Sequence, residues 1–306
     1  MSAALTEHPV APRDRARRAR RYDGRRWFTG WRCLVPRRFD VTISLVLVCH
    51  DDSVPRDDSE VLKGGAVGGA TRVGRTVRRP VGPWTPAVHE LLEHLRSRGL
   101  RGVPEVQGID DDGREILTYL EGRGVPVDDE IVLDAVLEEA GQWLRDFHDA
   151  VDDFRPDGPR FWRQTGEVEL EPDQIICHHD PGAYNWIIQS GHFVAMVDWD
   201  MAGPGDPLQD LAFLAWTGVP LYREIPVEDV ARRLDLLCEV YGECGPFTLL
   251  DRVAERMTLA SERIAAGIER GDEGLANLQK VGEPQRTRDR VAAFRERIPA
   301  IQAALG

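Results

Sequence analysis

Cysteine is scarce in this sequence of 306 residues. There are five cysteines, with no Cys-x-x-Cys pair and no regular spacing between them. A disulfide-stapled fold or a zinc ribbon needs paired or evenly spaced cysteines, so both classes are excluded. The pattern favours a protein of a reducing compartment.

Long hydrophobic runs are lacking as well. The longest apolar stretch near the start, residues 41–49, is interrupted by Thr42 and Ser44 and is too short to cross a bilayer. It also begins too far from Met1 to be the core of a signal peptide. We therefore expect a cytoplasmic protein with no membrane partner.

Positive charge is in deficit overall, but it is concentrated at one end. The net charge is −13, whereas residues 1–40 hold eleven arginines and only four acidic residues. An acidic body repels phosphate backbones, so we do not expect nucleic acid as the main partner. Residues 1–50 are Arg-rich and are predicted to be a disordered N-terminal extension; an arm for nucleic acid or an anionic surface is the alternative.

Residues 51–120 predict a small β-rich lobe. Glycines punctuate short apolar segments over 60–79, which is typical of a hairpin with a glycine-rich tip. A helix should begin near Thr85, where a proline follows. Two more strands are expected at 103–106 and 115–120.

Residues 121–306 predict a larger, mainly helical lobe. Apolar residues recur with a helical period over 131–148, and the period returns in four later segments: 208–217, 227–241, 247–270 and 286–305. Three short apolar segments are expected to be strands: 175–177, 186–188 and 193–197. The fold class is therefore α+β, with a small β-rich N-lobe and a larger, mainly helical C-lobe.

The clearest chemical signal follows the first of these short apolar segments. Asp180 is followed by Asn185 five residues later, and Asp198 comes directly after the third segment. Phosphoryl transfer needs a carboxylate that orients the attacking hydroxyl and oxygen ligands that hold magnesium against the phosphates. The spacing matches the H-x-D-x-x-x-x-N loop and the later metal-binding Asp of kinases. Two alternatives stay open: a metal-dependent phosphohydrolase built on His178 and His179, and acids that only cap a strand end.

At these residues the chain resembles the aminoglycoside phosphotransferase family of small-molecule kinases, and within it the trifolitoxin-immunity-like subgroup. The similarity covers about residues 60–220. The resemblance implies a two-lobed protein-kinase-like fold and the use of ATP and magnesium. It makes Asp180 the catalytic base, His178 the residue that braces its loop, and Asn185 and Asp198 the magnesium ligands.

Three further residues enter through the same resemblance. Asp210 matches the family's buried acid that supports the catalytic loop. His179 is a departure, because the family usually has glycine there. His148 falls in the helix before the loop and is expected to be a packed structural residue.

The resemblance also assigns a cation for the α- and β-phosphates of ATP. Arg78 lies where the family places this cation on a strand, with Arg79 as the neighbouring possibility. Arginine can replace the usual lysine because it offers two parallel hydrogen bonds to phosphate. The helix partner of this cation would be Glu90 or His89.

Other nucleotide contacts are expected along the N-lobe. Backbone amides can approach phosphate oxygens where side chains are absent, so the glycine-rich tip is expected to be a phosphate lid, with an ordinary turn as the alternative. The segment 117–120 resembles the hinge whose backbone meets the adenine edge. The full set expected to bind the nucleotide is Gly64, Gly65, Gly68, Gly69, Arg78, Thr118 and Leu120.

The sequence thus predicts an ATP- and magnesium-dependent phosphotransferase that acts on a hydroxyl of a small molecule. Residues 121–170 carry fourteen acids against five arginines, which would attract a cationic acceptor such as an aminoglycoside; a solvated helical face is the ordinary alternative. The rival function is a non-catalytic immunity or binding protein on the same scaffold, which would bind a toxin or peptide without turnover.

Overall fold

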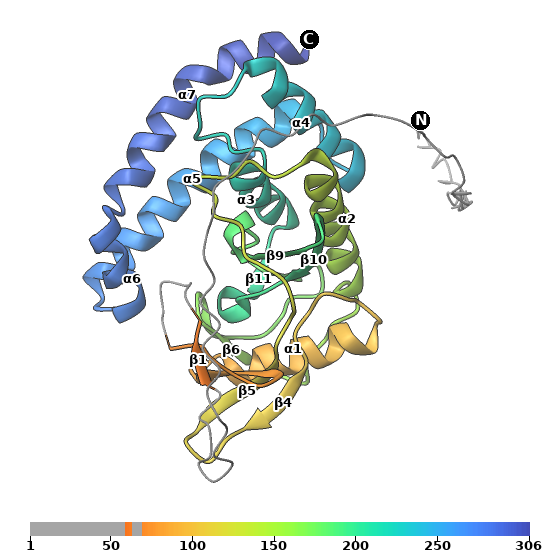
Figure 1. Ribbon diagram of the computed structural model, residues 1–306, viewed down its shortest axis with the longest axis vertical. Helices are drawn as coiled ribbons and strands as arrows, with labels where there is room; N and C mark the ends of the chain where they lie inside the picture. Colours follow the sequence, from red (N-terminus) through yellow and green to blue (C-terminus); the bar gives the residue numbers. More distant parts are fainter. Residues whose placement is uncertain (1–58, 63–68) are drawn as a thin grey trace, which may run out of the picture. The chain divides into compact units, whose positions relative to one another are not determined.

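The computed structural model describes residues 59–62 and 69–306 (Figure 1). The extension expected over 1–50 lies outside these residues, as do three glycines of the expected phosphate lid: Gly64, Gly65 and Gly68. The predictions made for them, and the domain boundaries at residues 50 and 120, stay predictions.

An antiparallel five-stranded sheet opens the described chain, in the spatial order β1-β2-β3-β5-β4. Its strands are β1 Ser59–Val61, β2 Thr71–Val73, β3 Thr76–Pro80, β4 Val106–Ile109 and β5 Arg114–Thr118. The hairpin expected over 60–79 is confirmed by the pairing of β1 with β2. The strand expected at 103–106 begins only at Val106. Between β3 and β5 the register places Arg79 opposite Glu115.

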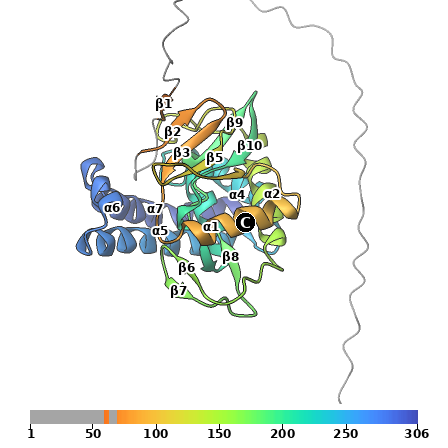
Figure 2. The same cartoon turned by 90° about the horizontal axis from the view of Figure 1, so that it is seen from below.

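Helix α1, Thr85–Ser97, follows the sheet strand β3 as expected. Its first residue is Thr85, whose hydroxyl accepts a hydrogen bond from the N–H of Gly82 (2.9 Å). The apolar face of the helix is buried, with Leu91 and Leu95 fully inaccessible to solvent. Figure 2 shows the strand β6 (Arg160–Trp162) beside this helix.

The rest of the chain is mainly helical. Its helices are α2 Asp134–Ala150, α3 Pro207–Gly218, α4 Val227–Tyr241, α5 Pro246–Glu269, α6 Glu273–Leu278 and α7 Gln285–Leu305. All the helical segments read from the apolar period are confirmed. Only α6 was not expected, because its six residues are too few to show a period.

Short strands connect these helices and carry the loops of the site. The three expected ones are β8 Ile175–Cys177, β9 Trp186–Gln189 and β10 His192–Met196. Strands β9 and β10 form a hairpin, β8 pairs with β11 (Gly203–Gly205), and β6 pairs with β7 (Gly166–Val168). The 3-10 turns η1 (Ala183–Asn185) and η2 (Trp199–Met201) follow β8 and β10.

A continuous apolar core joins the first helix to the later ones. At its centre Trp199 of η2 meets Phe147 of α2 edge-on, with ring centroids 5.2 Å apart. This contact supports the segment that begins with Asp198. No helix within 59–62 and 69–306 is both long and apolar enough to span a membrane.

Candidate functional site

The loop that follows β8 carries the predicted catalytic residues, and its backbone is bound by the side chain of Asp210. This residue lies in the first turn of α3 and is fully buried. Its carboxylate accepts hydrogen bonds from the backbone N–H groups of His178 (2.6 Å) and His179 (2.8 Å). Two charge-assisted bonds therefore fix the backbone immediately before Asp180.

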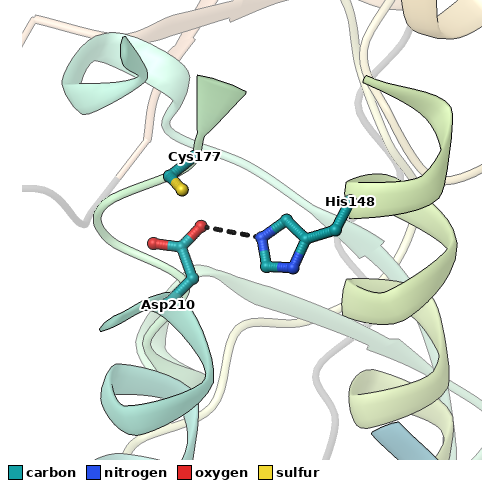
Figure 3. A group of neighbouring side chains, drawn as sticks. All are labelled: His148, Cys177 and Asp210. Atoms are coloured by element: carbon teal, nitrogen blue, oxygen red, sulfur yellow. Dashed lines mark hydrogen bonds and ion pairs between the residues drawn. The ribbon is translucent and has the colours of Figure 1, made fainter. Parts of the chain in front are cut away.

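Asp210 also ends a buried chain of polar groups that reaches α2 and α4; Figure 3 shows its first link, to His148 of α2. His148 Nε2 lies 3.3 Å from Asp210 Oδ2, and its Nδ1 lies 2.8 Å from the hydroxyl oxygen of Tyr241. Burial alone would raise the pKa of Asp210, but the hydrogen bond and charge of His148, with the other two imidazoles nearby, hold it at about 2. The carboxylate therefore stays ionised.

His148, Cys177 and Asp210 bring a nitrogen, a sulfur and an oxygen within 4.8 Å of one another (Figure 3). These residues do not fit a metal site, because hydrogen bonds already engage both ring nitrogens and both carboxylate oxygens. Burial raises the pKa of the Cys177 thiol well above its usual range, so the uncoordinated thiol is protonated. The cluster is structural.

His178 supports the loop as an uncharged ring. It is fully buried against Trp199, with ring centroids 4.6 Å apart, and its Nδ1 accepts a hydrogen bond from the N–H of Asp180 (3.3 Å). Burial lowers the pKa of His178 to about 4. A neutral ring bonded to the backbone of Asp180 suits a bracing role better than proton transfer.

This buried histidine predicts an acid-sensitive fold. Between pH 6.5, the ordinary pKa, and pH 4, the unfolded chain takes up a proton that folded His178 does not. The contribution of His178 to the free energy of unfolding should therefore fall with falling pH, by about 1.4 kcal/mol per unit and about 3 kcal/mol in all. The raised pKa of Asp180 contributes in the opposite direction over the same range, so the His178 effect is measured as the difference in slope between the natural protein and a His178 variant. Urea denaturation across this range measures the slope. His178→Asn should flatten it, whereas the exposed-site control His192→Asn should not; equal slopes would contradict the prediction.

His179 adopts a left-handed backbone conformation, with φ of 63°, which is the reason glycine suits this position. Its ring packs where a Cβ on Gly205 would lie only 2.5 Å from Cε1, and its Nε2 lies 3.1 Å from the carbonyl oxygen of Pro204. Its own carbonyl oxygen accepts a hydrogen bond from Arg256 (2.7 Å). These bonds offset a backbone strain of about 1–2 kcal/mol.

The rings of His178 and His179 therefore point to different places. One lies against Trp199 and the other against Pro204. A metal-dependent phosphohydrolase built on both histidines would need their nitrogens to converge on one ion. This geometry gives that alternative no support.

Asp180 lies at the centre of the loop with both carboxylate oxygens engaged. Asn185 Nδ2 donates to Asp180 Oδ2 (3.0 Å) and to its carbonyl oxygen (2.9 Å), and the Tyr184 hydroxyl donates to Oδ1. Burial raises the pKa of Asp180 to about 7; the Tyr184 bond opposes this rise and the charge of Asp198 adds to it. A carboxylate that titrates near neutrality is suited to take a proton from a hydroxyl.

Asp198 is brought to the same place by the end of β10. The N–H of Val197 donates to the carbonyl oxygen of Asn185 (3.0 Å), which ties the two segments together. Asp198 then takes a left-handed conformation, with φ of 66°, rare for a residue with a side chain. Its side chain is 34 % exposed.

Asn185 and Asp198 fit a magnesium site by their chemistry. Because the Asn185 amide nitrogen is directed at Asp180, its carbonyl oxygen is left available as a ligand. Burial raises the pKa of Asp198, with Arg79 opposing and Asp200 adding to the rise. Oxygen ligands among acids with unbalanced negative charge are what a hard divalent cation prefers.

Arg79 reaches this cluster from the sheet. Its guanidinium pairs with Asp200 and lies 3.6 Å from Asp198 and 3.2 Å from Glu115. Arg79 is thus a cation on β3 that faces the segment of Asp198 and Asp200.

Arg78 lies on the other face of β3. Its Nε is 3.5 Å from a carboxylate oxygen of Asp110, and its guanidinium donates to the hydroxyl of Thr76 (2.6 Å). Successive residues of a strand face opposite sides of the sheet, so only one of the two arginines can face the loop. Of the two candidates, Arg79 therefore lies beside Asp198 and Asp200, whereas Arg78 lies beside Asp110; the role of either as the phosphate cation stays a prediction.

The acid that pairs with this cation comes from β5 rather than from the helix. Glu115 is buried beside Arg79, and His89 of α1 places Nε2 2.9 Å from Glu115 Oε2. Glu90 turns away and binds Arg160 (2.6 Å). Neither expected helix residue pairs with the cation directly; α1 reaches it through His89 and Glu115.

The other described residues that were expected to bind the nucleotide are Gly69, Thr118 and Leu120. Gly69 has φ of 92°, and its carbonyl oxygen accepts a hydrogen bond from Arg114 (2.7 Å). The N–H of Thr118 donates to the carbonyl oxygen of Glu105 (2.9 Å), and its hydroxyl accepts a hydrogen bond from the N–H of Glu105 (2.8 Å). These groups therefore do not face an adenine edge. Leu120 is half-buried just beyond the end of β5.

Three residues of the site were not expected from the sequence. Tyr184 lies inside the catalytic motif, so its closeness to Asp180 in the chain was an available signal. Arg163, in the β6–β7 turn, lies 3.7 Å from Asp200, and Arg256 comes from α5. The two arginines come from distant segments and have no local signal.

The segment that carries this site matches a family of known proteins. Residues 162–247, which include the whole catalytic loop and Asp198, match the model of the phosphotransferase enzyme family. The trifolitoxin immunity protein of Rhizobium leguminosarum bv. trifolii is 35 % identical over 186 residues, covering 59 % of this chain and 68 % of that protein.

Two solved structures share the fold. An amicoumacin kinase in complex with AMP-PNP and Ca²⁺ is 12 % identical with a TM-score of 0.52, over 80 % of this chain and 88 % of that one. Spectinomycin phosphotransferase in complex with ADP and spectinomycin is 14 % identical with a TM-score of 0.50, over 78 % and 93 %. The two-lobed, protein-kinase-like α+β class is thereby confirmed. The family match and the identity to the immunity protein show that the chain belongs to the phosphotransferase enzyme family.

Proposed function

We propose that this protein transfers the γ-phosphoryl group of ATP, with magnesium, to a hydroxyl of a small molecule. The observation that carries the proposal is that Asn185 binds Asp180, that a backbone hydrogen bond ties this loop to the segment of Asp198, and that Arg79 reaches Asp198 from the sheet. Family membership supports the reaction class. ATP as donor also fits the cytoplasmic location, which stays a prediction.

Each residue has a separate task in this reaction. Asp180 would orient the acceptor hydroxyl and take its proton, while Arg79 would bind phosphate oxygens. Asn185 and Asp198 would hold magnesium, which supplies neutralisation of the phosphate charge. The rate would come from positioning and electrostatics rather than from covalent chemistry by the protein.

The two neighbouring arginines of β3 allow a matched test of the cation. Arg79→Gln should raise the KM for ATP by about 10- to 100-fold, since it removes charge-assisted bonds worth about 1.5–3 kcal/mol. Arg78→Gln should raise it by less than about threefold, because it loses only a partly exposed ion pair. Steady-state kinetics at saturating acceptor measure both values. The assignment fails if the Arg78 variant is the more impaired.

The described residues indicate the chemical class of the phosphoryl acceptor less clearly than that of the donor. Half of the fourteen acids of residues 121–170 are in ion pairs: Asp128, for example, lies 2.7 Å from Arg286, and Asp134 pairs with Arg233. These pairs fasten α7 and α4 to the segment before and at the start of α2. The acidic stretch therefore supports a cationic acceptor only weakly, and neutral alcohols belong in any screen.

The function is tested by incubating the protein with γ-labelled ATP, magnesium and candidate acceptors. The acceptors are aminoglycosides, choline-like alcohols, sugars and nucleosides. We expect labelled product with at least one class and none with Asp180→Asn. Failure of ATP to bind, shown by the lack of any magnesium-dependent shift in melting temperature, would refute the proposal.

A non-catalytic immunity protein is the second candidate. It is favoured by the 35 % identity to the trifolitoxin immunity protein. Such a protein would bind a toxin or peptide with the same affinity in the presence or absence of ATP, and Asp180→Asn would not weaken that binding. Dependence of protection on both ATP and Asp180 would decide for the enzyme.

A further inference from the structure

The Oδ1 atom of Asp180, the carboxylate oxygen that Asn185 does not bind, accepts a hydrogen bond from a hydroxyl of the protein itself. Asn185 occupies Oδ2, and the phenolic hydroxyl of Tyr184 donates to Oδ1. In the proposed reaction this is the place of the acceptor hydroxyl, because a general base must hydrogen-bond the proton that it removes. Tyr184 therefore stands where an acceptor would stand.

The ring of Tyr184 is held in this position by its neighbours. A Cβ on Gly182 would lie 2.6 Å from ring Cε1, so glycine is required for the ring to lie over the loop. Phe213 of α3 meets the ring edge-on, with centroids 6.3 Å apart, and Ala183 N–H is fixed by the hydroxyl of Thr217 (2.8 Å). The residue is nevertheless 41 % exposed, so a phosphate can approach it from solvent.

A buried cation contacts the same phenylalanine ring as the tyrosine. Arg256 is 4 % exposed, and its guanidinium stacks over Phe213 at 4.3 Å from the ring centroid. One amine binds the carbonyl oxygen of His179, whereas Nη1 has no hydrogen-bond partner in the described part of the chain. A buried charge with an unused donor is costly, and nearby negative charge lowers that cost. A phosphoryl group on Tyr184 would bring such charge.

We propose that Tyr184 is itself a phosphoryl acceptor, so that the protein phosphorylates this hydroxyl when a nucleoside triphosphate is bound and no other acceptor has displaced the ring. The inference rests on the proposed function. Tyr184 Oη forms a bond to the γ-phosphorus, while the bond from that phosphorus to the β–γ bridging oxygen breaks and its electron pair leaves with the nucleoside diphosphate. The phenolic proton passes to Asp180 Oδ1 and then to water.

Phosphorylation of Tyr184 inhibits phosphoryl transfer to an external acceptor. It adds a charge of about −1.5 to −2 next to Asp180 and removes the donor that now binds the carboxylate. Because the modified ring still covers the base, transfer to an external hydroxyl stops until the phosphoryl group is removed or the ring swings away. Self-labelling and transfer to an added acceptor therefore compete.

The test uses the full chain, first treated with a phosphatase that is then removed, and γ-labelled ATP with magnesium but no acceptor. We expect up to one phosphoryl group per chain, found by intact mass and located to Tyr184 by peptide mapping. Tyr184→Phe should carry no label, and Tyr222→Phe, a half-buried tyrosine outside the site, should label like the natural protein. Asp180→Asn should label at least about 100-fold more slowly. The rate constant should not change with protein concentration, as an intramolecular step requires.

The outcomes separate this inference from the proposed function. Label on another residue, or label equal in Tyr184→Phe, overturns the self-phosphorylation. So does an unlabelled protein that binds ATP with magnesium and phosphorylates an added acceptor, and that result leaves the proposed function standing. If ATP does not bind at all, both fail.

Discussion

Replacing Asp180 with asparagine is expected to slow phosphoryl transfer by about 10²- to 10⁴-fold, the usual contribution of a positioned general base. The amide has the size of the carboxylate and can keep a hydrogen bond to Tyr184 or Asn185, so the loop should stay in place. What is lost is a group able to take a proton, because a neutral amide is not a base near pH 7. Nucleotide binding should persist, since Arg79 and Asp198 are unchanged.

Single-turnover transfer from γ-labelled ATP measures this effect, with the nucleotide-induced shift in melting temperature as the measure of binding. Asp206→Asn is the matched control: it makes the same chemical change at the N-cap of α3, where asparagine caps as well as aspartate. The control should retain full transfer. Undiminished transfer by the Asp180 variant would remove this residue from the reaction.

Replacing Asp210 with alanine is expected to lower the free energy of unfolding by about 3–5 kcal/mol, as is typical when one partner of a buried charged network is removed. The fully buried carboxylate accepts from two backbone N–H groups and faces His148. Without it the donors of His178 and His179 have no acceptor in an interior that water does not reach.

Urea denaturation at pH 7 measures the loss. Asp206→Ala, at the N-cap of the same helix, removes the N-cap bond to Leu208 and an exposed ion pair with Arg252, and should cost about 1 kcal/mol. Asp210→Asn should fall between the two, because one oxygen can still accept a backbone bond. A loss for Asp210→Ala no larger than that for Asp206→Ala would show that the loop does not depend on the buried carboxylate.

The helices could be predicted because their apolar period matches what they bury. In α2 the residues that set the period, Leu137, Leu144 and Phe147, are fully buried. The strands β6, β7 and β11 could not be predicted in the same way. Each of these strands is only three residues long, which is too short to show an alternating pattern. Each forms because it pairs with another strand: β11, for example, pairs with β8, which lies about thirty residues earlier in the chain.

The two arginines of β3 show the limit of a local pattern. Alternation along a strand states that Arg78 and Arg79 face opposite sides. It does not state which side meets the catalytic loop, since that depends on how the sheet lies against Asp198 and Asp200. The partner acid was hidden for the same reason: Glu115 is opposite Arg79 in register but 36 positions away in sequence.

The order of residues along the chain by itself determined the helices, the short strands of the catalytic region and the loop that joins Asp180 to Asn185, because each depends on neighbours within a few positions. Tertiary structure alone decided which arginine faces Asp198, which acid of the sheet pairs with that arginine, and that the guanidinium of Arg256 binds the loop. Those relations depend on how separate elements dock, and docking is set by the shape of the shared core rather than by any local run of residues.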